Sequence, residues 1–162
     1  MIKAAEVRGG VRDVSQRRPG GMTVTGSPRT APTVLSMLAS ARRGLAEAAD
    51  ETSPSARYVT AHLAALRAAA AVVAARGEPR PRSRKPHSVW ELLPQVEPAL
   101  SEWAAYFAAG AGKRAAAEAG LPRAASAREA DDLLRDAETF LSLAETALGA
   151  QVQSPLPLRP AG

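Results

Sequence analysis

The two histidines of this chain each follow an arginine at a spacing that suits acid–base chemistry on a phosphodiester. Arg57 precedes His62 and Arg82 precedes His87, in both cases with four residues between them, and Arg80 precedes His87 with six. An arginine can hold a phosphate group while a histidine moves a proton from a ribose 2′-hydroxyl. Arg57, His62, Arg82 and His87 are therefore the candidate catalytic residues of a metal-independent ribonuclease.

Both histidines also have a structural interpretation. The chain contains 18 arginines in 162 residues, so this spacing arises easily by chance. On a straight helix five residues turn through about 500°, which leaves the side chains of Arg57 and His62 about 140° apart. One site would then need the copy from a second subunit. His62 equally fits a histidine packed on a bundle face, and His87 fits a structural residue at the start of a helix.

Positive charge is concentrated in two segments. Residues 1–31 hold six cationic and two acidic groups, and residues 76–87 hold five cationic groups and one glutamate, so each has a net charge of +4. The rest of the chain has a net charge of −3, which completes the total of +5. A flexible basic segment can contact nucleic-acid phosphates. The candidate nucleic-acid-binding residues are Arg76, Arg80, Arg82, Arg84 and Lys85.

Other kinds of site have little support in the sequence. The chain has no cysteine, and the acidic group between Glu129 and Asp136 has no histidine beside it, so we predict no metal and no cofactor. The segment 110–113 has a glycine-rich sequence but lacks the rest of a phosphate-loop pattern. No uninterrupted apolar run reaches the roughly 18 to 20 residues of a membrane span. We therefore expect a cytoplasmic protein without a membrane segment.

The spacing of apolar residues predicts helices throughout the centre of the chain and shows no strand pattern. Ser53 before Pro54 is a typical helix start, and the Ser-x-x-Glu patterns at Ser88 and Ser126 are capping boxes. Pro98 should kink or split the third helix. The predicted helices cover residues 32–50, 54–76, 88–95, 97 to 110 or 118, and 126–148. This pattern indicates an all-α antiparallel bundle of four main helices, the third kinked or split.

The flanking segments differ from the helical region in composition. Residues 1–31 are rich in Gly, Pro, Ser and Arg without periodicity, which predicts a disordered basic arm. Met22 is an alternative translation start inside it. The predicted domain is 32–148, with a Pro/Arg linker at 77–87 and a Pro-rich tail at 149–162.

Several segments of the predicted helices resemble the HEPN-domain superfamily. They lie at 57–58, 61–69, 86–93, 102–107 and 127–134, and the likeness extends over residues 32–148. The chain is most similar to the actinobacterial SAV-type HEPN family. This resemblance implies a helical bundle that forms homodimers.

The resemblance also implies what to look for in a catalytic member. Many HEPN proteins are metal-independent ribonucleases with an arginine four to six residues before a histidine, near the start of the last long helix. Others are inactive, and serve as dimerising or nucleotide-binding partners of nucleotidyltransferases. Here Arg123 and Arg128 lie in that region without a following histidine. We therefore expect a non-catalytic or degenerate module that binds RNA or a partner. The alternatives are a toxin-like ribonuclease using an Arg-x4-His pair, and a partner subunit of a nucleotidyltransferase.

Overall fold

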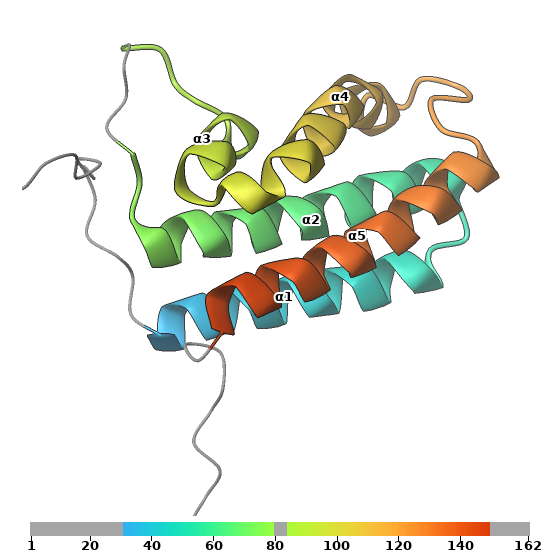
Figure 1. The fold of residues 1–162 in the computed structure, drawn as a ribbon. Helices are drawn as coiled ribbons and strands as arrows, with labels where there is room; N and C mark the ends of the chain where they lie inside the picture. The colour runs from blue at the N-terminus through green and yellow to red at the C-terminus, as the bar shows by residue number, and fades with distance from the viewer. Residues whose placement is uncertain (1–30, 80–83, 150–162) are drawn as a thin grey trace, which may run out of the picture.

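The computed structural model describes residues 31–79 and 84–149 of the chain, which fold into a helical bundle (Figure 1). In chain order the elements are α1 (Ala31–Asp50), α2 (Pro54–Arg76), α3 (Val89–Val96), the short 3₁₀ helix η1 (Pro98–Leu100), α4 (Ser101–Glu118) and α5 (Ala127–Leu148). No strand occurs within this described part. The predicted all-α bundle with a split third helix is confirmed.

The central element of the bundle is α2. It packs along α1 on one side and along α5 on another, and α3 and α4 cover its remaining face (Figure 1). Its buried residues include seven alanines. Alanine lets neighbouring helices approach closely because its side chain is a single methyl group. By length and composition alone α2 could also cross a membrane, although 61% of its most apolar window is buried inside the bundle. Its apolar character therefore fits the core helix of this fold.

Local capping chemistry explains where the helices begin and end. The Ser53 hydroxyl accepts a hydrogen bond from the Ala56 amide, and Pro54 occupies the first position of α2. After α2, Gly77 adopts a φ of 85°, which favours glycine. The third predicted helix divides where Pro98 begins η1, because proline has no amide hydrogen for the continuing helix. By contrast, α4 continues through both of its glycines to Glu118.

The large side chains of the core come from the shorter helices and from α5. Phe107 of α4 and Phe140 of α5 are fully buried, with ring centroids 5.2 Å apart. Trp90 of α3 stacks on Phe107 at 5.1 Å, and Leu93 is also fully buried. Aromatic rings bury more apolar area than any other side chain, so this cluster compensates for the alanine-rich α2.

Some of the predicted segments lie outside the described residues. These are the basic arm up to residue 30, the centre of the linker at 80–83 with Arg80 and Arg82, and the tail from residue 150. The expectations for them stay predictions.

We expect Ser126→Ala to lower the free energy of unfolding by about 1 kcal/mol. The Ser126 hydroxyl accepts a hydrogen bond from the Glu129 amide at 3.2 Å, and the Glu129 carboxylate accepts one from the Ser126 amide at 2.8 Å. Urea denaturation measures the difference. Ser142→Ala is the matched control, because Ser142 is exposed in the middle of the same helix and caps nothing. An equal effect in both variants would contradict the capping role.

Candidate functional site

The first candidate pair, Arg57 and His62, does not form one site. The Arg57 guanidinium makes an ion pair with Asp131 of α5 and donates a hydrogen bond to the Glu51 carbonyl at 2.7 Å. It therefore joins the start of α2 to the start of α5. His62 points into the core instead, and its side chain is 0% exposed. The angular separation expected from five residues of helix places the two side chains in different surroundings.

His62 occupies an aromatic cage. Its ring lies 5.9 Å from the centroids of both Trp90 and Phe107 and stacks loosely on Tyr58 at 6.5 Å. The Nε2 atom lies 2.8 Å from the Phe107 carbonyl oxygen. Because a carbonyl can only accept, Nε2 carries the hydrogen and donates it. Burial lowers the pKa of His62 below its ordinary value of 6.5, so the neutral ring is the stable form.

A glycine of α4 provides the space for this arrangement. A Cβ atom added at Gly110 would lie 2.8 Å from the Tyr58 hydroxyl oxygen and 3.5 Å from Cδ2 of His62. Burial raises the pKa of Tyr58, and the neighbouring Lys113 partly opposes that rise. Gly110 thus lets α4 lie directly over the two polar rings of α2.

Two cations of α4 flank the buried rings, and sequence reasoning missed both of them. Lys113 makes an ion pair with Glu129 of α5, and Arg114 pairs with Glu118 at 2.9 Å within α4. Arg114 is close enough to His62 to lower its pKa. The arginine nearest to His62 in charge effect therefore comes from another helix. Spacing along one helix gives no signal for such a pair.

The second candidate pair is only partly within the described residues. His87 is half-buried in the loop before α3, and Arg82 lies outside the described part. The proposed pairing of Arg82 with His87 stays a prediction.

The basic residues proposed for nucleic-acid binding have different surroundings. Arg76 donates hydrogen bonds to the Glu97 carboxylate at 3.0 Å and to the Ala147 carbonyl at 2.7 Å, so it connects α2 to the end of α5. Arg84 and Lys85 are exposed before α3. Arg76 therefore has a structural role here, while Arg84 and Lys85 stay available to a ligand.

An open groove of about 590 Å³ lies between the first turns of α2 and the loop after α4. Ser53, Ser55 and Thr60 give it a hydroxyl-rich wall, and Glu118 and Arg123 lie at its edge. Arg123 has a φ of 57°, a left-handed conformation that is uncommon for residues other than glycine. The groove depends on tertiary packing, so the sequence gave no sign of it.

The described residues contain no cluster of three or more His, Asp or Glu side chains placed to hold a metal ion. The model of an SAV-type HEPN family matches residues 48–145, more than half of the chain. This chain belongs to the HEPN family. No curated protein and no solved structure matches it. The match extends from the end of α1 into the last turns of α5, and so covers the aromatic cage and both cations beside it.

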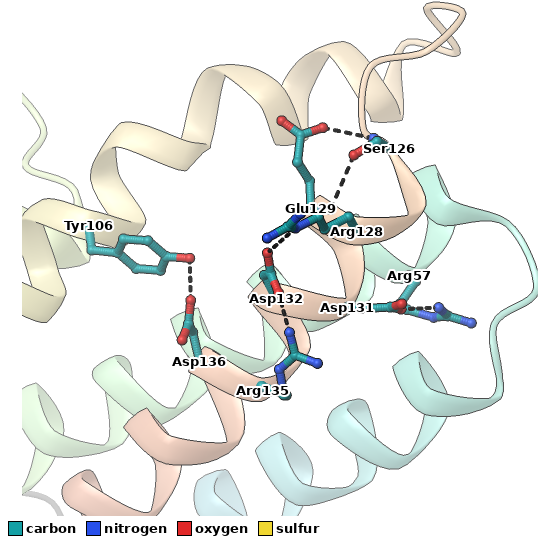
Figure 2. Close-up of polar contacts among 9 residues, drawn as sticks. All are labelled: Arg57, Tyr106, Ser126, Arg128, Glu129, Asp131, Asp132, Arg135 and Asp136. Carbon is teal, nitrogen blue, oxygen red and sulfur yellow. Dashed lines mark hydrogen bonds and ion pairs between the residues drawn. The ribbon is translucent and has the colours of Figure 1, made fainter.

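In this HEPN domain the first turns of α5 carry acidic groups where the resemblance leads one to expect an arginine and a histidine (Figure 2). Asp131 holds Arg57, and Asp132 makes an ion pair with Arg135. Asp136 accepts a hydrogen bond from the Tyr106 hydroxyl at 2.5 Å, which joins α4 to α5. These carboxylates therefore connect helices at the position where a catalytic member is expected to hold its histidine.

The same acidic groups set the local electrostatics. Hydrogen bonding from Lys113, followed by that from Ser126, lowers the pKa of the Glu129 carboxyl to about 2. Burial and the hydrogen bond to Asp136 raise the pKa of Tyr106 well above 10. Glu129 is therefore charged and Tyr106 neutral near neutral pH, and neither supplies a proton carrier for acid–base chemistry there.

Proposed function

We propose that this HEPN domain is a non-catalytic binding module that acts through a protein partner, as a homodimer. The observation that carries the proposal is the position of His62. The chain has only two histidines, and His62 has no exposed surface from which to reach a substrate. Its ring nitrogen donates to a backbone carbonyl, as a packed structural histidine does.

Charge favours a protein partner over RNA. Residues 31–79 and 84–149 together hold 12 Lys and Arg and 14 Asp and Glu, a net charge of −2. Nucleic-acid affinity comes mainly from cations that neutralise phosphates, and Arg76, Arg114 and Lys113 are each paired with a carboxylate. RNA binding by the body of the domain is therefore the weaker alternative.

The proposal is tested first by incubating the full chain with a labelled mixed RNA pool in EDTA. We expect the RNA to stay intact, because His62 is enclosed. His87→Gln is measured in parallel, and Arg84→Gln serves as a matched control for loss of one exposed charge in the same loop. Cleavage by the wild type that disappears in His87→Gln would overturn the proposal and identify a ribonuclease with His87 as its base.

Two further measurements address binding. Sedimentation equilibrium of the wild type should give twice the monomer mass, and a monomer at all concentrations would remove the dimer from the proposal. A gel-shift series against the same RNA should show only weak binding that falls steeply with added salt. Tight binding at physiological salt, lost when Arg80, Arg82 and Arg84 are neutralised together, would replace the protein partner with RNA.

A further inference from the structure

One ring nitrogen of His62 is buried without a partner. Nδ1 has no hydrogen-bond partner among the described residues, and almost no solvent reaches it. In the neutral ring Nδ1 is only an acceptor, so the missing partner is tolerable among aromatic rings. Protonation would turn Nδ1 into a charged donor with nothing to receive its hydrogen, which is far less favourable.

The charges that face His62 do not provide a counterion for that proton. From α4, Arg114 disfavours the protonated ring, and Glu118, which favours it, is already paired with Arg114. From α2, the titratable neighbour is Tyr58, whose raised pKa keeps it neutral near pH 7. From α3 and α4, the neighbours in the cage are Trp90 and Phe107, which do not titrate.

The segment of α4 that follows this contact is weakly held. We call residues 108–118 the distal segment of α4. All of these residues are described, and none of their side chains is buried. The distal segment is attached to the other helices through the Lys113–Glu129 ion pair and the contact of Gly110 with Tyr58 and His62. By comparison, α1 and α5 each bury several large side chains against the bundle.

We propose that His62 is a proton-sensitive latch for the distal segment of α4. The neutral ring donates from Nε2 to the Phe107 carbonyl, at the point where the distal segment begins. Protonation at Nδ1 favours any arrangement in which water reaches that nitrogen. Movement of the distal segment provides such an arrangement without disturbing α1, α2 and α5. The opened form exposes the ring faces of Trp90 and Phe107 on a surface that is closed at neutral pH.

The direction of the pH dependence follows from the lowered pKa of His62. The unfolded or opened chain binds a proton with a pKa near 6.5, whereas the closed form binds it only at lower pH. The closed form is therefore fully favoured above 6.5. Its advantage is lost as the pH falls from 6.5 toward the lowered value.

Hydrogen exchange measured by mass spectrometry on the full chain tests the latch. From about pH 7.5 to about pH 5, after correction for intrinsic exchange, amides of the distal segment should lose protection by about tenfold or more, while those at the centre of α2 should keep theirs. His62→Gln should abolish this pH dependence, because its amide can donate to the Phe107 carbonyl but does not titrate.

His87→Gln is the matched control, since it removes the only other imidazole and should leave the transition unchanged. If His62→Gln does not fold, imidazole ¹⁵N spectra of the wild type decide. They should show the Nε2–H form at neutral pH and a change in the distal segment that titrates together with His62.

Three results would overturn the latch. One is unchanged protection of the distal segment across the pH range. Another is a transition that His87→Gln removes. The third is a loss of protection shared equally by α1, α2 and α5, which would mean that acid unfolds the whole bundle.

Discussion

Phe107→Ala should lower the free energy of unfolding by about 3 to 5 kcal/mol, a large part of the stability of a small domain. Phe107 is fully buried, and its ring contacts those of Trp90, Trp103 and Phe140. Removing it leaves a cavity that rigid neighbouring rings cannot fill. Because α2 contributes mainly methyl groups, no other large side chain on that helix can replace the lost contact. Chemical denaturation followed by circular dichroism measures the loss.

Leu121→Ala is the control for this experiment, since Leu121 is 56% exposed in the loop after α4 and should change stability by less than about 0.5 kcal/mol. A Phe107→Ala/Phe140→Ala double variant should lose less than the sum of the single losses, because the two rings share one contact. A loss below about 1 kcal/mol in Phe107→Ala would mean that the aromatic cluster does not hold the bundle together.

The helices could be predicted well where a local chemical signal marks their ends. The prediction of 54–76 for the second helix matches α2, because Ser53, Pro54 and Gly77 act within a few residues of the boundary they set. The same holds for α5, which begins after the capping residue Ser126. Pro98 likewise acts on the amide of its own residue, so a split third helix was predictable.

The end of the fourth helix was harder to predict because it depends on distant parts of the chain. Gly110 and Gly112 weaken a helix locally, which left 110 and 118 as alternative ends. In the structure α4 continues to Glu118. The ion pair of Lys113 with Glu129 supports the segment beyond Gly112 from α5, and spacing within one helix does not predict that contact.

The candidate site shows the same division. Sequence spacing selected Arg57 and His62, but their tertiary partners, Asp131 and the Phe107 carbonyl, lie 74 and 45 residues further along the chain. A short regular expression cannot distinguish an arginine that faces a substrate from one that joins two helices. The family could nevertheless be identified from sequence, because HEPN similarity is spread over most of the helices rather than held in one pair.

Gly110→Ala should destabilise the domain by about 1 to 2 kcal/mol, although glycine to alanine inside a helix normally stabilises by about 0.5 to 1 kcal/mol. The new methyl group would lie 2.8 Å from the Tyr58 hydroxyl oxygen. Tyr58 is only 6% exposed, so its hydroxyl cannot move unless the whole ring moves within the core. Urea denaturation of the variant and the wild type measures the change.

Gly112→Ala is the matched control, since an added Cβ there meets nothing within 4 Å and the ordinary helix gain should appear. Tyr58→Phe identifies the cause, because it removes the hydroxyl oxygen and leaves Cδ2 of His62, at 3.5 Å, as the nearest of the contacts. In that background Gly110→Ala should become neutral or stabilising, which gives a coupling of about 2 kcal/mol. If Gly110→Ala destabilises equally in both backgrounds, the hydroxyl contact is not the reason for a glycine at this position, and the close approach of α4 to α2 depends on the His62 ring instead.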